Sequence, residues 1–166
     1  MPGDDPQPPN AIELEGGTPK LTEIHMAVGI AVLATNAAAA VWGGIAWLRR
    51  IPSVIFWYLL RVAQGVVILQ VALGLFLLIG QGKRASSDLH YLYGVALLVI
   101  ALVAEGFRAG VAQREIDKRE IDDVDALDRR EQVLLARAVV RNEMGIMTMS
   151  VIAVVTLALR AFATGG

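Results

Sequence analysis

Residues 54–79 read VIFWYLLRVAQGVVILQVALGLFLLI, and this run contains a single charged side chain, that of Arg61. A helix needs about 20 apolar residues to cross the hydrocarbon core of a bilayer, which is about 30 Å thick. Lipid offers the backbone no hydrogen-bond partners, so such a run crosses the membrane as a helix and not as a loop. The run therefore predicts one transmembrane helix.

Three further apolar runs predict three more spans, over about 24–48, 89–111 and 133–162, and the last of these has a polar first third. A longer connector at about 113–131 is rich in charge, with acids and bases three and four residues apart, which predicts a solvated helical extension. We expect an all-α fold: an integral membrane four-helix bundle over residues 23–166.

Polar residues next to the spans indicate where the helices begin. Ser86, Ser87 and Asp88 are expected to cap the third helix, and Thr22 with Glu23 the first. Residues 1–22 are rich in proline and acids. They lack the basic and apolar regions of a secretory signal, so we expect a disordered tail.

The composition excludes several classes of function. The chain has 166 residues, of which 55% are hydrophobic, no cysteine, two histidines and a net charge of −1. Without cysteine there can be no disulfide, thiolate cluster or c-type haem attachment. The charge gives no reason to expect nucleic acid as a partner. No catalytic motif is present, so we do not expect the chain to act as an enzyme on its own.

Basic residues are concentrated on one side of the predicted bundle. Connectors 49–53 and 113–131 hold six of the twelve arginines and one lysine, and such basic segments stay in the cytoplasm. We therefore expect a multi-pass protein of the cell inner (plasma) membrane, with both termini outside and the charged connector in the cytoplasm.

The two histidines lie in matching segments. Residues 22–33, TEIHMAVGIAVL, align with residues 87–98, SDLHYLYGVALL, at a constant offset of 65. The alignment places His25 on His90 and Gly29 on Gly94. Spans 2 and 4 share an Arg-x-x-x-Gly motif. We infer a duplicated helical hairpin, with repeat one over 22–84 and repeat two over 87–166.

Two hairpins of the same topology form a parallel repeat, with a pseudo-two-fold axis along the membrane normal. In an up-down-up-down bundle the first and third helices are diagonal. His25 and His90 should then face each other at one depth, near the outer face.

A facing histidine pair can ligate one haem iron from both sides, so the sequence predicts a b-type haem held by His25 and His90. Gly29 and Gly94, one turn deeper, would leave room for the ring. Three basic residues at the same surface are candidates to contact the haem propionates: Lys83, Arg84 and Arg160.

Other interpretations of the histidines stay open. A histidine near a helix start often just meets water and lipid headgroups, and then no cofactor is bound. A zinc or copper site would add Glu23 and Asp88, which also match in the repeat. Two pigments with one histidine each form a third option.

A second set of polar residues lies within the spans. Arg61, Arg141 and Glu105 are candidate contacts for an anionic lipid or a quinone headgroup. The arginines could instead pair with Glu105 and Glu143, or extend to the inner surface. Three amides are expected to hydrogen-bond between helices: Asn36, Gln64 and Gln70.

The sequence therefore predicts an electron-transfer subunit with one bis-histidine haem near the outer face. One haem cannot carry an electron across the membrane, so we expect a larger membrane complex or a homo-oligomer, and quinone as a candidate partner. The alternative is a cofactor-free structural, accessory or anchor subunit. Only the predicted architecture resembles four-helix membrane cytochromes, and architecture does not fix function.

Overall fold

The computed structural model describes residues 20–165, and this part of the chain is helical with no strand. The prediction of an all-α fold is confirmed. The predicted tail lies outside the described residues up to position 19, whereas Leu21 and Thr22 already belong to the first helix. The elements are α1 (Leu21–Leu48), α2 (Val54–Leu75), the π-helical turn η1 (Phe76–Gly80), α3 (Asp88–Ala109), α4 (Val111–Lys118) and α5 (Arg129–Gly165).

Four helical segments are long and apolar enough to cross a membrane: Leu21–Leu48, Val54–Gly80, Asp88–Lys118 and Arg129–Gly165. Their outer faces carry many exposed large apolar side chains, including Leu48 and Ile79, each 79% exposed. Water does not tolerate apolar surface on this scale, whereas lipid does. The chain thus has the character of a multi-pass membrane protein.

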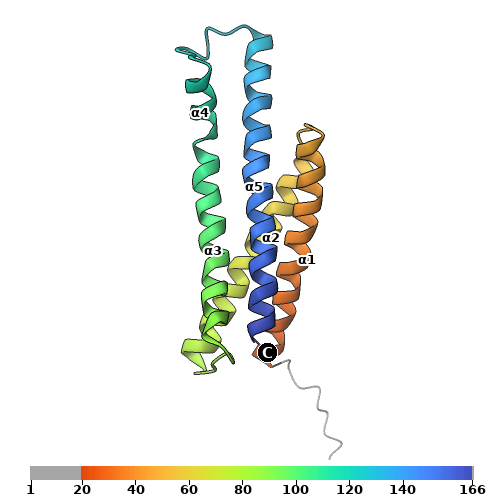
Figure 1. Cartoon of the computed structure of the whole chain (residues 1–166), viewed down its shortest axis with the longest axis vertical. Helices are drawn as coiled ribbons and strands as arrows, with labels where there is room; N and C mark the ends of the chain where they lie inside the picture. Colours follow the sequence, from red (N-terminus) through yellow and green to blue (C-terminus); the bar gives the residue numbers. More distant parts are fainter. Residues whose placement is uncertain (1–19, 166) are drawn as a thin grey trace, which may run out of the picture.

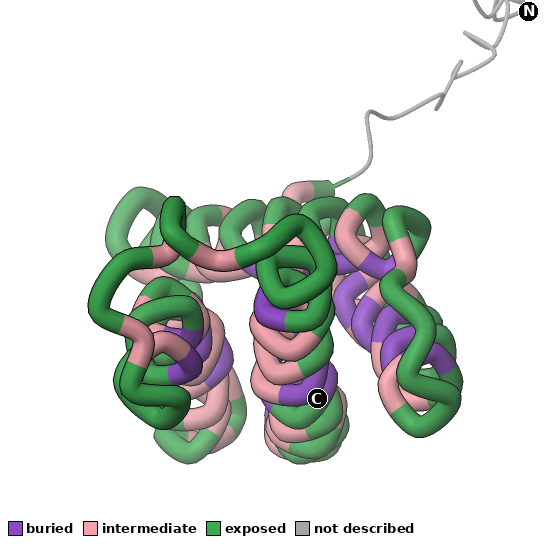
Figure 2. Tube along the Cα trace, turned by 90° about the horizontal axis from the view of Figure 1, so that it is seen from above, coloured by how far each residue is buried: buried purple, intermediate pink, exposed green. Residues whose placement is uncertain are grey.

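Three helices lie side by side in the order α3, α5, α1, and α2 slants behind them (Figure 1). α5 packs against both α1 and α3, whereas α2 packs mainly along α1 and makes fewer contacts with α3. Viewed from above, buried residues lie on the helix sides that face neighbours and exposed residues lie outside (Figure 2). α5 thereby separates α1 from α3 over most of the bundle.

The core has two parts. One buried cluster, around Phe56, Leu60 and Met147, fills the half of the bundle near the α1–α2 turn. A smaller cluster, around Val32, Val67 and Leu97, lies toward the other half. These clusters hold α1, α2, α3 and α5 together within a small protein interior.

The helix starts agree only in part with the sequence prediction. Ser87 caps α3, because its hydroxyl accepts a hydrogen bond from the Leu89 amide at 3.2 Å. Ser53 caps α2 in the same way through the Phe56 amide, also at 3.2 Å. Thr22 and Glu23 do not cap α1: the helix begins at Leu21, and Lys20 precedes it without a side-chain cap.

The helical extension predicted for the charged connector is present only in part, because residues 119–128 are not helical. α4 continues α3 to Lys118, and α5 begins at Arg129 and runs for 37 residues. A helix of that length is about 55 Å long, well beyond the membrane core. α4 and the start of α5 therefore rise past the α1–α2 turn (Figure 1). At the opposite end, Thr22 and Gly165 line one cavity, so both described chain ends lie together.

Candidate functional site

The two histidines meet at the end of the bundle where α1 and α3 begin. His25 on α1 and His90 on α3 have ring centroids 6.1 Å apart and ring planes at 63°. Both side chains are half-buried. α1 and α3 do not otherwise pack closely, so the pair spans the bundle between helices that α5 keeps apart. The structure thus brings together two residues that are 65 positions apart in the sequence.

Each ring is held by a hydrogen bond to a third helix. His90 Nδ1 donates to the carbonyl oxygen of Ala161 on α5 at 2.9 Å. A carbonyl can only accept, so the proton must be on Nδ1, and His90 Nε2 carries a lone pair. His25 Nε2 lies 3.2 Å from the side-chain amide Nε2 of Gln70 on α2. These contacts fix the direction of both imidazoles.

Two buried polar atoms at this site have no hydrogen-bond partner among the described residues: His25 Nδ1 and Gln70 Oε1. An unpartnered buried polar atom costs about 1–3 kcal/mol, so most native structures avoid it. If the side-chain amide of Gln70 is flipped by 180°, Gln70 Oε1 accepts a hydrogen bond from His25 Nε2–H. His25 Nδ1 then carries a lone pair. Each ring would then present one free nitrogen.

Glycines of the neighbouring helices lie against the rings. A Cβ added at Gly74 would lie 3.2 Å from His25 Cε1, and one at Gly165 would lie 2.6 Å from His90 Nδ1. Neither glycine was singled out from the sequence. Gly29, expected to make room for a haem, instead makes room for Gln70, whose Nε2 would be 3.2 Å from its Cβ. At Gly94 a Cβ would meet nothing within 4 Å.

A cavity of about 330 Å³ opens beside the histidine pair. Gly94 lines it together with both histidines and Gln70, and Lys83 and Arg84 line its outer edge. The loop that carries these two cations is held by Tyr91, whose hydroxyl accepts a hydrogen bond from the Ala85 amide at 2.7 Å. Other lining residues are apolar: Val71, Leu75, Leu77, Leu78, Val95 and Leu97.

Arg160, the third candidate propionate contact, is not part of this cavity. It is exposed on α5 and does not appear among the lining residues. The structure therefore brings Lys83 and Arg84 to the histidine pair but leaves Arg160 outside it.

A zinc or copper site built from the histidines and neighbouring acids does not form. Within residues 20–165, no three His, Asp or Glu side chains lie close enough together to hold a metal ion. Glu23 and Asp88 therefore do not complete a four-ligand set with His25 and His90, and that alternative is wrong. A cofactor that needs only two protein ligands remains compatible with the geometry.

A second polar cluster surrounds Glu105 in the other half of the bundle. Its Oε1 accepts from Arg61 Nη1 at 2.7 Å and from Gln64 Nε2 at 2.8 Å. Its Oε2 accepts from Arg108 Nε at 2.7 Å, and Arg108 also lies 3.9 Å from Glu143. The expected pairing of Arg61 with Glu105 is thus present, and the carboxylate is fully hydrogen-bonded.

Arg141 does not join that cluster. It lines a separate cavity near the α1–α2 turn and forms no ion pair within residues 20–165. Of the three amides expected to link helices, Gln64 and Gln70 do so. Asn36 instead donates to the Val32 carbonyl of its own helix at 2.9 Å.

Comparisons of the chain with models of protein families, with curated proteins and with solved structures found no match. The function must therefore be argued from the site itself.

Proposed function

We propose that this chain is a membrane haem protein, in which His25 and His90 hold one b-type haem and the protein transfers electrons as a subunit of a larger assembly. The observation that carries the proposal is the histidine pair. The only two histidines of the chain come together from different helices, with their ring centroids 6.1 Å apart.

That separation suits two imidazoles on opposite sides of one metal. A bond of about 2 Å from a metal to each histidine nitrogen places the two nitrogens about 4 Å apart, and the ring centres lie somewhat further apart. The centroid separation of 6.1 Å is compatible with this arrangement and supports the proposal.

The hydrogen bonds of the two rings support the same use. A ligating histidine normally donates its other N–H to a carbonyl, carboxylate or water, which fixes the tautomer and the ring direction. His90 does this with Ala161, and Gln70 can do it for His25. The unpartnered buried His25 Nδ1 is the kind of atom that a ligand would satisfy.

The lining of the cavity, mostly apolar with two cations at its edge, suits part of an apolar ring that carries acidic substituents. The cavity has the size of a small ligand pocket, about 300 Å³ or more, and Gly94 presents no side chain to it. Lys83 and Arg84 would pair with the propionates. When bound, haem supplies reversible one-electron transfer at iron, and the chain's residues orient it and keep it out of water.

A tandem repeat is the simplest origin for such a paired site, and we propose it here. Both histidines line one cavity and each binds a third helix, as two copies of one hairpin would. The second halves have diverged, since Arg61 pairs with Glu105 whereas Arg141 lines a different cavity.

The assembly and its orientation follow from the same proposal. We place the histidine end outside the inner (plasma) membrane and the arginine-rich connector in the cytoplasm, from the distribution of basic residues. A single haem near one face needs a partner to receive its electron. A quinone and a redox subunit of a larger complex are the partners we propose.

The first test is a reduced-minus-oxidised absorption spectrum of the full chain purified gently in detergent. We expect the α-band of a low-spin b-type haem, and its loss in both His25→Ala and His90→Ala. Protein that is folded and has no Soret or α-band, even after haem is added, would overturn the proposal.

A second variant separates haem binding from folding. Gly94→Leu adds a side chain that meets no protein atom nearby but enters the cavity. We expect normal thermal unfolding in the absence of haem and at least about tenfold weaker haem loading, the scale of changes beside a metal ligand. Gly106→Leu is the control, because this glycine also faces open space but lies outside the cavity.

The second candidate function is a cofactor-free structural or anchor subunit. It is favoured by one observation: the two imidazoles already contact each other edge to face and are each held by a third helix. In that case His25→Phe would preserve the assembly and its stability. Co-purification with a complex fits both candidates, so the spectrum decides between them.

A further inference from the structure

A cavity at the opposite end of the bundle gathers four arginines. It measures about 250 Å³ and lies beside the turn between α1 and α2. The basic residues that line it come from three parts of the chain: Arg50 from the turn, Arg119 from the end of α4, and Arg137 and Arg141 from α5. No acidic side chain is part of its lining, although the whole chain has a net charge of −1.

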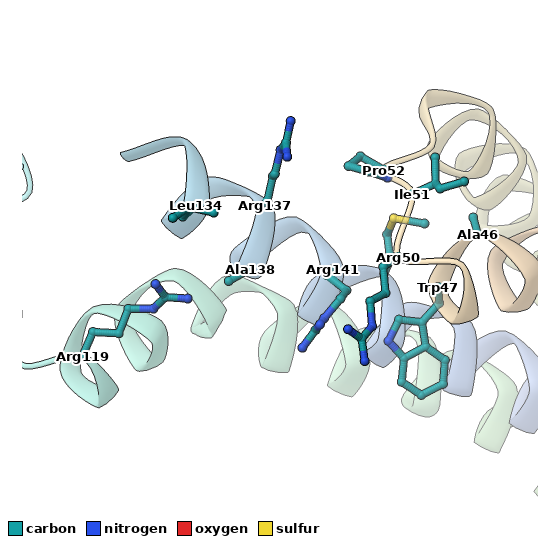
Figure 3. Close-up of a pocket in the computed structure, with 11 residues that line it drawn as sticks. Ala46, Trp47, Arg50, Ile51, Pro52, Arg119, Leu134, Arg137, Ala138 and Arg141 are labelled. Atoms are coloured by element: carbon teal, nitrogen blue, oxygen red, sulfur yellow. The ribbon is translucent and has the colours of Figure 1, made fainter. Parts of the chain in front are cut away.

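One of the four arginines, Arg119, is paired with Glu115 Oε2 at 3.6 Å, but the other three differ from the arginines nearby. Arg61 and Arg108 are each paired with a carboxylate at 2.7 Å. Arg50, Arg137 and Arg141, by contrast, have no ion pair with any acid in residues 20–165. Figure 3 shows the Arg50 guanidinium next to the Trp47 indole, whereas the Arg141 side chain extends away from the indole and Arg137 turns outward. Three arginines gathered without an acidic partner favour an external anion.

The backbone at Arg50 gives an independent reason to look at this side chain. Arg50 has φ 57°, in the left-handed region that favours glycine, where α1 ends. The Ile51 amide donates back to the Ala46 carbonyl at 2.9 Å, as at many helix ends that place a glycine here. An arginine at such a position keeps its charge in the cavity at the expense of backbone strain.

Trp47 connects this cavity to an apolar groove. It lines both the arginine cavity and a larger, open groove of about 700 Å³ between α3 and α5. Its ring lies against Gly145, where an added Cβ would be 2.8 Å from Trp47 Nε1. The groove is mostly apolar, and its lining includes Ile100, Val103, Phe107, Ile146 and Met149.

We propose that this end of the bundle binds one anionic phospholipid, with its phosphate in the arginine cavity and an acyl chain in the groove between α3 and α5. The phosphate diester matches the planar donor groups of Arg50 and Arg141, which bind phosphate oxygens in pairs. The neighbouring groove favours a lipid over a soluble phosphate compound, because only a lipid carries an apolar chain next to its phosphate. Basic pockets between transmembrane helices hold lipid headgroups in this manner.

The test uses native mass spectrometry of the full chain in detergent, titrated with phosphatidylglycerol or with phosphatidylcholine of the same acyl chains. We expect one phosphatidylglycerol to bind the wild type more tightly than phosphatidylcholine does. The variant Arg50→Gly, Arg141→Gln should bind it about thirtyfold more weakly, because each basic contact at a membrane surface contributes about 1 kcal/mol. The control variant Arg49→Gln, Arg130→Gln removes the same charge outside the cavity and should bind as the wild type does.

Arg50→Gly also separates binding from folding, since glycine relaxes the left-handed backbone. We expect it to unfold at the same or a higher temperature than the wild type while it binds lipid more weakly. Val103→Trp, in the groove, should weaken phosphatidylglycerol binding, whereas Leu102→Trp, which is exposed outside the groove, should not.

Three results would overturn the proposal. Equal weakening in the cavity and control variants would mean that surface charge alone attracts the lipid. Equal binding of phosphatidylcholine would remove the role of anionic charge. Inorganic phosphate that competes for the cavity while Val103→Trp has no effect would assign it to a soluble phosphate compound.

Discussion

The polar side chains around Glu105 and those around His25 differ in how completely they are hydrogen-bonded. Around Glu105, both carboxylate oxygens accept hydrogen bonds from neighbouring side chains at 2.7–2.8 Å. Around His25, two buried polar atoms have no partner in the described chain, and a cavity opens beside them. The cost of burying a polar group is thus met by protein partners at Glu105 and not at His25, although Thr148 Oγ1, in the half with Glu105, also lacks a partner.

This difference distinguishes polar groups that stabilise the fold from polar groups that are available to bind a ligand. A fully hydrogen-bonded network stabilises the fold and has no donor or acceptor left for a ligand. Unpartnered polar groups beside a cavity lower the stability of the protein until a ligand binds. The packing follows the same division. At Gly43, in the half with Glu105, an added Cβ would be 2.4 Å from the Phe56 ring, whereas at Gly94 it would meet nothing within 4 Å.

The largest effect should come from breaking the tightly packed half. Gly43→Leu forces a side chain against Phe56 and Thr148, the latter 2.6 Å from the added Cβ. Overpacking of this kind costs about 3 kcal/mol, which we expect as a lower free energy of unfolding in detergent. Gly44→Leu, where nothing lies within 4 Å, is the control and should change stability by less than about 0.5 kcal/mol. Equal effects would mean that α1 is not packed as described.

A smaller loss should follow from breaking the glutamate network. Glu105→Gln removes the charge that Arg61 and Arg108 share and leaves a donor facing them. Hydrogen bonds to charged groups contribute about 1.5–3 kcal/mol, so we expect a loss of about 2 kcal/mol in a denaturation experiment. Glu143→Gln removes a single contact of 3.9 Å and should cost less than about 1 kcal/mol. If the Glu143 variant were the less stable of the two, the network would be centred on Glu143 and not on Glu105.

The loosely packed end should tolerate added volume. Gly74→Ala places a methyl group 3.2 Å from His25 Cε1, and the cavity lets that ring move. We expect a cost below about 1 kcal/mol, measured as thermal unfolding of haem-free protein. Gly43→Ala is the matched comparison and should cost more. A reversed order would show that the histidine end is the rigid one.

The smallest effect on stability should come from removing the unpartnered groups themselves. In haem-free protein, the double variant His25→Leu, Gln70→Leu should be within about 0.5 kcal/mol of the wild type or more stable, because two unsatisfied atoms are lost. Added haem should raise the melting temperature of the wild type, since a ligand that binds only the folded state stabilises it. The double variant should show no such rise, and a rise in both would place the haem elsewhere.

The sequence predicted the spans well because hydropathy over about 20 residues is a strong signal. It also predicted that α4 extends α3, and that His25 and His90 face each other, from the matching segments around them. The ligand role of the histidines stays a prediction. Gln64 and Gln70 link helices as expected because each lies on a face turned toward another helix.

The remaining features depend on details that one sequence does not contain. Asn36 was expected to bond another helix but finds the Val32 carbonyl in its own. Gly74 and Gly165 were missed, since a glycine's role depends on which ring the helix tilt brings beside it. The slant of α2 likewise places Gly29 against Gln70. Arg61 and Arg141, which align in the proposed repeat, have different neighbours.

The short helix α4 and the long helix α5 place the loop that joins them far from the two buried clusters of the bundle. Residues 119–128 lie at the far tip, and the packing of α5 on α1 and α3 takes place well below them (Figure 1). A break in the peptide chain at this tip would remove no packing contact within the spans. The molecule is therefore suited to assembly from two separately made polypeptides, one of three spans and one of a single span. The covalent link then sets only the effective concentration of one piece around the other.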